Sequence, residues 1–356
     1  LSEPRGGDSE MAHELELNAD GTARMFYVGD ETPWHGLGVR LDAPPTASQA
    51  IREAGLDWEV ELRPVYAQTS ETLNTAYTWN NPTYAPIEGS HAVTRLDDNA
   101  CLGVVGQRYT PVQNSQAFRF FDRLISDGTG TYETAGSLKG GRVIWVMVKL
   151  HRSAQIAHDD RVESYLFLST SHDGSTAVNV KFSDVRVVCN NTLTFASEGA
   201  GDKLSARHSA NVDRALELIA ELIDAQQSRF IASVDQYVRL AALDVDVKML
   251  RRYVRVVLRD IDPDDADAVK TVDADADAKP ARGENRIVEI FETDPTCTMR
   301  SIRGSWWAGL NALTRYVDYE RGADADKRFY SAMLGQGATV KQRALSSAVA
   351  LSGCEK

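Results

Sequence analysis

Midway along the chain, the apolar positions form runs that indicate β-strands joined by tight turns. The segment 131–150 places two such runs on either side of a Gly-Gly pair at 140–141, which is typical of a two-residue hairpin. The segment 165–182 repeats this arrangement around Asp-Gly at 173–174, and VRVV at 185–188 predicts one further strand. These runs together predict an antiparallel sheet.

Elsewhere, apolar residues recur at three- and four-residue spacing, which indicates amphipathic helices. NSQAFRFFDRLIS (114–126) has this spacing, and Asn114 or Ser115 is suited to cap its first turn. ASQAIREAG (47–55) predicts another helix, and residues 56–109 between the two contain several short strand patterns.

The pattern is helical from 209 to 260 and again near the C-terminus, where SWWAGLNALTRYVDYE (305–320) is the clearest segment. Residues 262–285 are an Asp/Ala-rich run without apolar periodicity, which predicts an exposed or disordered linker. The predicted class is therefore α+β, an antiparallel sheet with packed helices followed by a helical C-terminal part. Its predicted divisions are an extension or expression remnant (1–10), an α+β core (11–210), a helical segment (211–261), an acidic flexible linker (262–285) and a helical C-terminal segment (286–356).

The composition is that of a globular protein, with 356 residues of which 43% are hydrophobic. No run of apolar residues is long enough to span a membrane, and the first residues do not form a secretory signal. The four cysteines and seven histidines are scattered, so we expect neither disulfides nor a metal site. We therefore expect a cytoplasmic protein with no metal and no cofactor.

The net charge of −12 argues against a nucleic-acid partner until its distribution is considered. Residues 11–112 hold six basic and fourteen acidic residues, and residues 262–285 carry a net charge of −5. The rest of the chain is nearly balanced, which leaves room for a local basic groove.

Basic residues of the predicted sheet are the first candidates for such a groove. Lys139 and Arg142 flank the predicted hairpin tip, where two cations can contact phosphates without reading sequence. Either they do so, or they are merely solvated. Lys149, Lys181 and Arg186 are the further candidates on the strands.

A second cationic stripe lies on the predicted helix at 245–260. Arg251 and Arg255 are four residues apart and so share one face. They can bind nucleic acid, or they can pair with the acidic run that follows. The pattern favours neither alternative.

Several residues allow a catalytic or ligand-binding interpretation, but each has a simpler structural one. Ser171-His172-Asp173 contains the residue types of a triad, yet neighbours on a strand point to opposite faces, so an Asp-Gly turn is favoured. Cys189 has no adjacent base and is interpreted as a buried thiol. Asn190 or Asn191 after it is suited to cap a helix through TLTFAS.

Tryptophans near the two ends of the chain raise the same question. Trp34 in PWHGLG is interpreted as buried at a tight turn, the alternative being a base stacked on its ring. Trp307 has the helical spacing of a core residue, whereas Trp306 belongs to a second face that either binds a partner or packs inward.

Five segments in fixed order carry a family resemblance. They are PWHGLG (33–38), TPVQNSQAF (110–118), SHDGS (171–175), VRVVCNNTL (185–193) and GSWWAGLNALTRYVDY (304–319). The chain resembles a phage/plasmid-like family built on an uncharacterised domain, domain of unknown function 932, from about residue 15 to 350. The resemblance implies a mobile genetic element as the setting but no activity and no catalytic residues.

We therefore expect a protein that is not an enzyme and that binds or anneals single-stranded DNA, as in recombination, as a homo-oligomer. The nucleic-acid-binding residues expected are Lys139, Arg142, Lys149, Lys181, Arg186, Arg251 and Arg255. The alternative is a mobile-element protein that binds a host protein, for example to counter a defence system, and the acidic N-terminal third favours it.

Overall fold

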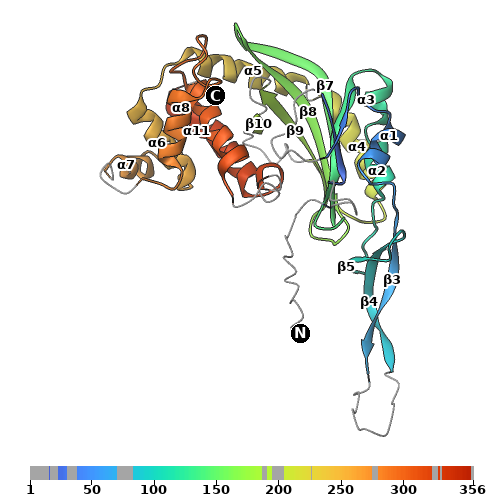
Figure 1. Cartoon of the computed structure of the whole chain (residues 1–356). Helices are drawn as coiled ribbons and strands as arrows, with labels where there is room; N and C mark the ends of the chain where they lie inside the picture. The colour runs from blue at the N-terminus through green and yellow to red at the C-terminus, as the bar shows by residue number, and fades with distance from the viewer. Residues whose placement is uncertain are drawn as a thin grey trace, which may run out of the picture.

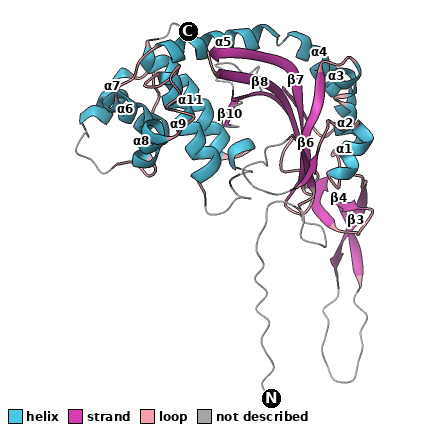
Figure 2. Ribbon diagram, turned by 45° about the horizontal axis from the view of Figure 1, so that its top comes forward, coloured by secondary structure: helices cyan, strands magenta, loops and turns pink. Residues whose placement is uncertain are grey.

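A strongly curved sheet lies between one group of helices and the helical C-terminal part of the chain (Figure 1). Figure 2 shows the same arrangement from a second direction, with α1–α4 on one side of β6 and β7 and the C-terminal helices on the other. The structure is a computed structural model. It describes residues 16, 23–29, 38–69, 83–186, 191–194, 204–225, 227–274, 280–322, 328 and 331–353.

The larger sheet has the strand order β10-β9-β8-β7-β6-β1-β2, and β11 also pairs with β9. All of these pairings are antiparallel except that of β1 with β2, which is parallel. The predicted α+β class is confirmed, and the sheet is mixed because of that one edge pair. The strands are β1 (Met25–Val28), β2 (Val39–Leu41), β6 (Gly130–Leu138), β7 (Val143–Ala157), β8 (Asp160–Ser171), β9 (Val178–Arg186), β10 (Asn191–Thr194) and β11 (Leu204–Ala206).

Both hairpins predicted from glycine are present at the predicted positions, but their turns are longer than two residues and span 139–142 and 172–177. Between β6 and β7, Lys139, Gly140 and Gly141 have φ values of 55°, 64° and 83°. Glycine enters this left-handed region without cost, whereas lysine does so with some strain, so the turn depends on the two glycines. The β8–β9 turn contains Gly174, with φ of 74°.

The two faces of the larger sheet differ in what covers them. Residues directly opposite each other on antiparallel strands share a face, and successive residues alternate. Ile144, Val146 and Leu168 belong to the face whose core is packed against the helices α1 to α4. The neighbouring positions Trp145, Ser169 and Asn179 are opposite one another on the other face.

The helices that cover the first face are α1 (Ala47–Glu53), α2 (Asn114–Arg119), α3 (Asp122–Ser126) and α4 (Val212–Ala225). The predicted single helix over 114–126 is instead two, because the chain turns at Phe120 and Phe121. This turn allows Phe118 and Phe121 to be buried together. The N-cap is Gln113, whose side chain forms a capping box with Gln116, and not Asn114 or Ser115 as predicted.

A smaller antiparallel sheet projects from the body of the molecule (Figure 1). It has the order β3-β4-β5, and it confirms the short strands predicted within 56–109. Its outer part leaves Tyr66, Tyr84 and Ile87 exposed. The strands are β3 (Val60–Gln68), β4 (Tyr84–Arg95) and β5 (Cys101–Gly106).

The C-terminal part is helical, as predicted, and has a core of its own around Trp307, Tyr253 and Leu313. Asp246 and Ser305 cap α6 and α9 by accepting hydrogen bonds from the backbone. None of the described helices combines the length and apolar character that a membrane span requires. The elements are α5 (Gln227–Ala242), α6 (Val247–Leu258), α7 (Ala266–Ala274), α8 (Glu284–Thr293), α9 (Trp306–Arg315), the π-helix η1 (Tyr316–Glu320) and α11 (Gln336–Ser352).

The acidic run 262–285 differs from its prediction as a flexible linker. Residues 266–274 form α7, and Val269 and Val272 are buried against Val256 of α6. Two valines three residues apart are enough to fix one helical turn on a neighbour, although the surrounding aspartates hide this pattern in the sequence.

The end of β9 also differs from prediction. Val185 and Arg186 continue β9 instead of starting a separate strand. Asn191 pairs with Arg186 as the first residue of β10, so the helix predicted through TLTFAS is wrong over 191–194. Cys189 and Asn190 lie outside the described residues.

Candidate nucleic-acid interface

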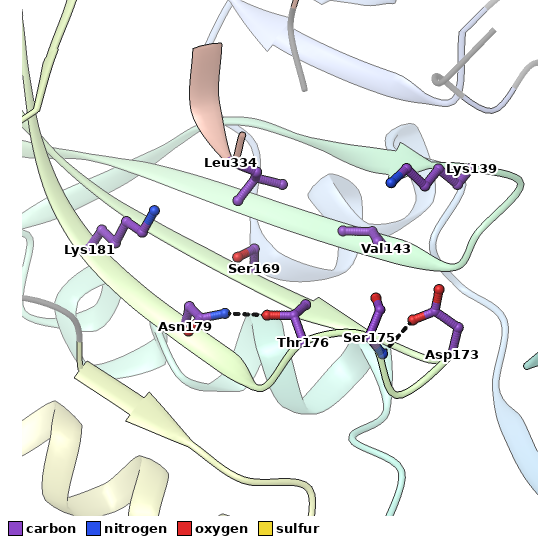
Figure 3. Close-up of a pocket in the computed structure, with 9 residues that line it drawn as sticks. All are labelled: Lys139, Val143, Ser169, Asp173, Ser175, Thr176, Asn179, Lys181 and Leu334. Atoms are coloured by element: carbon purple, nitrogen blue, oxygen red, sulfur yellow. Dashed lines mark hydrogen bonds between the residues drawn. The ribbon is translucent and has the colours of Figure 1, made fainter. Parts of the chain in front are cut away.

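A cavity opens on the face of the larger sheet that α1–α4 do not cover, and it encloses about 200 Å³ (Figure 3). Strands β7, β8 and β9 supply its floor, and the two hairpin turns supply its rim. Leu334, from the segment before α11, contributes an apolar wall. The residues that line it are Lys139, Val143, Ser169, Asp173, Ser175, Thr176, Asn179, Lys181 and Leu334.

Two of the predicted cations, Lys139 and Lys181, line this cavity. Lys139 comes from the β6–β7 turn, and Lys181 from β9, where it lies opposite Phe167. Figure 3 shows the two lysines at opposite ends of the lining, with Ser169 between them. The sheet thus brings together residues that are 42 positions apart in sequence.

Two buried polar atoms in the cavity lining have no hydrogen-bond partner among the described residues. They are Ser169 Oγ and Asn179 Oδ1, in side chains that are only 1% and 4% exposed. The amide of Asn179 is fixed in orientation, because its nitrogen donates to Thr176 Oγ1 at 2.8 Å and to the carbonyl oxygen of Ala177 at 2.8 Å. An unsatisfied buried acceptor costs on the order of 1–3 kcal/mol.

Asp173 adds a negative charge to the rim. Its Oδ1 accepts a hydrogen bond from the Ser175 backbone at 2.8 Å. Desolvation pushes the pKa of Asp173 upward, but hydrogen bonds from Ser175 and the charge of Arg142 hold it below its ordinary value. The rim therefore combines cations with one ionised carboxylate, and exposed Arg142 lies within electrostatic reach of that carboxylate.

Lys149 lies on the same sheet face but does not line the cavity. It is opposite Tyr165, and its Nζ is 2.6 Å from Glu163 Oε2. Arg161 pairs with the same carboxylate at 2.8 Å, so Glu163 already balances the charge of Lys149. Nearby, burial and the charge of Glu163 raise the pKa of Glu133 to about 7, against the opposing effect of Lys149.

The prediction that Arg186 contacts nucleic acid is wrong. Its side chain is fully buried, and its Nη2 is 2.7 Å from Asp160 Oδ2. A second bond from Nη2 reaches the carbonyl oxygen of Thr296 at 2.8 Å. Arg186 was a candidate only because of its charge. In the structure the curved strand β9 places its side chain beneath the C-terminal helices.

For the arginine stripe on α6, the structure supports pairing with the acidic run. Glu284, the last acidic residue of that run, is fully buried and accepts from Arg251 at 3.1 Å and from Arg255 at 2.9 Å. Arg255 is itself buried, so its assignment to nucleic-acid binding is wrong. Arg251 is partly exposed, with its guanidinium directed to Glu284 and Asn285.

Ser171, His172 and Asp173 do not form a triad. Ser171 Oγ exchanges hydrogen bonds with the backbone of Thr176, while His172 Nε2 is 2.9 Å from Asn114 Oδ1 in the core. Burial lowers the pKa of His172 to about 3, so this ring is neutral at pH 7. The Asp-Gly turn interpretation is confirmed. Cys189 and Trp34 lie outside the described residues.

The tandem tryptophans are core residues. Trp307 is fully buried and donates its indole N–H to Asp160 Oδ2 at 2.8 Å. Trp306 is 4% exposed and packs against Tyr253, so an available second face at Trp306 is wrong. Arg315, the last residue of α9, pairs with Asp294 at 2.6 Å.

Sequence reasoning found the two lysines of the cavity but missed Ser169 and Asn179. A faint signal existed, because Asn179 alternates with Val178 and Val180 and therefore shares a strand face with Lys181. Only the strand register shows that Ser169 and Asn179 are opposite each other on the cavity face.

Comparison with known proteins gives one match. A family model described as Domain of unknown function (DUF932) matches residues 101–344, which is more than half of the chain. The matched range contains the whole cavity lining. No curated protein and no solved structure matches the chain.

Proposed function

The chain belongs to the DUF932 family, and we propose that it binds single-stranded nucleic acid through phosphates at the cavity face of its larger sheet. The observation that carries the proposal is the placement of Lys139 and Lys181 around one cavity with neutral hydroxyl and amide groups between them. Lysine ammonium groups and hydroxyl donors are the usual phosphate contacts, and they act independently of base sequence. Arg142, at the same hairpin tip, adds a third cation.

The net charge of −12 does not oppose this proposal, because much of the acid lies elsewhere. It is concentrated in residues 11–112 and in the run 262–285, whose last carboxylate is neutralised by Arg251 and Arg255. On the cavity face, Lys139, Arg142 and Lys181 carry three positive charges, and Asp173 carries one negative charge. A binding surface with so few cations supports weak binding by one protomer, and this binding weakens further as salt is added.

Such a binding surface favours assembly of several copies along a strand, since linking weak sites multiplies their combined affinity. The biological role that we propose is annealing of single-stranded DNA by a homo-oligomer encoded by a phage, prophage or plasmid. His172 Nε2 and Asp173 Oδ1 are engaged in hydrogen bonds of the core and of the β8–β9 turn, which favours a binding role for this site.

The test is fluorescence anisotropy with a labelled single-stranded oligonucleotide at about 50 mM salt. The double variant Lys139→Ala/Lys181→Ala should weaken binding about tenfold or more, since two charge-assisted contacts are lost. The control variant Lys248→Ala/Lys270→Ala removes the same charge from exposed positions of the helical part. No binding by the unmodified protein, or equal loss in both variants, would overturn the proposal.

A second candidate function is binding of a host protein through the smaller sheet. The observation that favours it is the exposure of Tyr66, Tyr84 and Ile87 on strands that project from the body (Figure 1). Exposed aromatic residues with few charges around them are typical of protein interfaces. Capture of one host protein from nuclease-treated lysate, lost in Tyr66→Ser/Tyr84→Ser but kept in Lys139→Ala/Lys181→Ala, would favour this candidate over the first.

A further inference from the structure

We propose that the cavity receives a single nucleotide, with its phosphate between Lys139 and Lys181 and a donor group of its base or sugar on Ser169 Oγ and Asn179 Oδ1. This inference rests on the proposed function, because it names the unit of the nucleic acid that enters the same site. It also explains features that phosphate binding alone leaves unexplained.

The first step concerns the unpartnered acceptor. Asn179 Oδ1 can only accept, and its orientation is fixed by the two bonds that its nitrogen donates. A phosphodiester has no donor to offer it. Every nucleobase, by contrast, carries an N–H group, and every ribose carries hydroxyl groups. Ser169 Oγ, also without a partner among the described residues, can serve as donor or acceptor beside it.

The second step concerns the apolar part of the lining. Val143 and Leu334 contribute carbon surface to a cavity whose other walls are polar. Leu334 also packs against the cluster around Trp145 and Phe167, so this wall is anchored in the core. A ligand with one apolar ring face and polar edges matches such a lining, whereas a bare anion leaves its carbon wall unused.

The third step is size. A cavity of roughly 150 Å³ admits benzene. The cavity of about 200 Å³ is larger than this, so it has room for one base ring but not for a stack of bases. The phosphate then lies between Lys139 of the rim and Lys181 of the β9 floor.

The fourth step is charge. Lys139 and Lys181 place two positive charges at the cavity, and Asp173 places one negative charge at its rim. A phosphomonoester carries about −1.5 to −2 at neutral pH and is matched by the two lysines. A triphosphate would bring further negative charge toward Asp173. The class selected is therefore a nucleoside monophosphate, either free or at the 5′-phosphorylated end of a strand.

Ser169→Ala is the most direct test of this assignment. Because Ser169 Oγ has no partner in the described part of the protein, removing it should not lower the free energy of unfolding. Binding of nucleoside 5′-monophosphates, measured by calorimetry, should weaken about three- to tenfold through the lost hydrogen bond. Ser153→Ala, the same change at an exposed position of β7, should bind as the unmodified protein does.

Inorganic phosphate and oligonucleotides complete the experiment. The inference requires monophosphates to bind more tightly than inorganic phosphate, and Ser169→Ala to leave phosphate binding unchanged. Stronger competition by a 5′-phosphorylated oligonucleotide than by its 5′-hydroxyl form identifies a strand end as the source, and equal competition identifies the free nucleotide.

Three results would overturn the inference. Equal affinity for inorganic phosphate and monophosphates would reduce the cavity to an anion site. Oligonucleotide binding that depends on Lys139 and Lys181, without any monophosphate binding, would leave the proposed function intact and remove the nucleotide pocket. Absence of both kinds of binding would remove the two proposals together.

Discussion

Arg186 and Trp307 bond to the same buried carboxylate, that of Asp160. Arg186 Nε lies 2.8 Å from both Asp160 oxygens, and Trp307 Nε1 lies 2.8 Å from Oδ2. Arg186 is the last residue of β9 and belongs to the VRVVCNNTL segment, whereas Trp307 lies in α9 and belongs to the GSWWAGLNALTRYVDY segment. Asp160 therefore joins two segments that carry the family resemblance, and it fastens the sheet to the C-terminal helices.

This relationship predicts a large stability loss on Asp160→Asn. The substitution leaves the Arg186 guanidinium buried without its counter-charge, which costs about 3–5 kcal/mol. Urea unfolding monitored by tryptophan fluorescence measures the loss. Asp42→Asn is the matched control, because the side chain of Asp42 is 95% exposed and its change should stay within about 0.5 kcal/mol. A loss below about 1 kcal/mol would contradict the role of this bridge.

The neutral, buried His172 predicts acid sensitivity. Its folded pKa of about 3 lies below the unfolded value near 6.5, so the folded state binds fewer protons than the unfolded state over this range. Its contribution to stability is therefore fully present above pH 6.5 and is lost as the pH falls toward 3. The loss between pH 6.5 and 5 should be about 2 kcal/mol.

His172→Gln isolates this effect, since glutamine keeps a polar group near Asn114 but does not titrate. Unfolding curves at several pH values should have a smaller slope between pH 6.5 and 5 in the variant. Burial also lowers the pKa of His208, so part of the slope should remain. An unchanged slope would show that His172 is not the group responsible.

Glu133 predicts the opposite pH dependence. Its folded pKa of about 7 lies above the ordinary value of 4.5, so its favourable contribution is present below pH 4.5 and is lost as the pH rises through 7. Glu133→Gln should therefore stabilise the protein at pH 8 by about 2 kcal/mol relative to its effect at pH 5. Thermal unfolding at both pH values measures this difference. Glu88→Gln, an exposed counterpart, should show no such difference.

The cavity face predicts a shallow salt dependence of single-stranded DNA binding. Three phosphate contacts, by Lys139, Arg142 and Lys181, give a slope of about −2 in log K against log salt. Lys139→Ala/Lys181→Ala should reduce the magnitude of this slope to roughly 0.7. Titrations at about 25 to 200 mM salt, a range low enough for weak binding to be detected, measure this slope. A slope steeper than about −5 would point to a larger surface than this cavity face.

Helix α7 predicts that the acidic run is structural. Val272→Asp should destabilise the protein by about 2–3 kcal/mol, because it places a charge against Val256 in a buried cluster. Calorimetric unfolding measures this cost, and Thr271→Asp, the same replacement at an exposed position of the same helix, serves as control. A tolerated Val272→Asp would mean that α7 adds little to the fold.

The sequence by itself determined the elements whose information is local. Alternation of apolar residues and the glycines at 140–141 and 174 specify the two hairpins, since a left-handed turn and a half-buried strand are properties of a few neighbouring residues. The helical periodicity of 305–320 did the same for α9. The family resemblance likewise rested on short segments, and the match over 101–344 confirms the family.

Only the tertiary structure decided which charged side chains line the cavity and which are buried elsewhere. Lys181 and Arg186 lie five residues apart on β9, yet one lines a cavity and the other is buried on Asp160. Their sequence environment is alike, but burial depends on sheet curvature and on helices that come more than a hundred residues later. The pairing of Ser169 with Asn179 across β8 and β9 is decided in the same way, by register between strands. Local pattern fixes the conformation of a segment, whereas the chemistry of a site depends on contacts between distant segments.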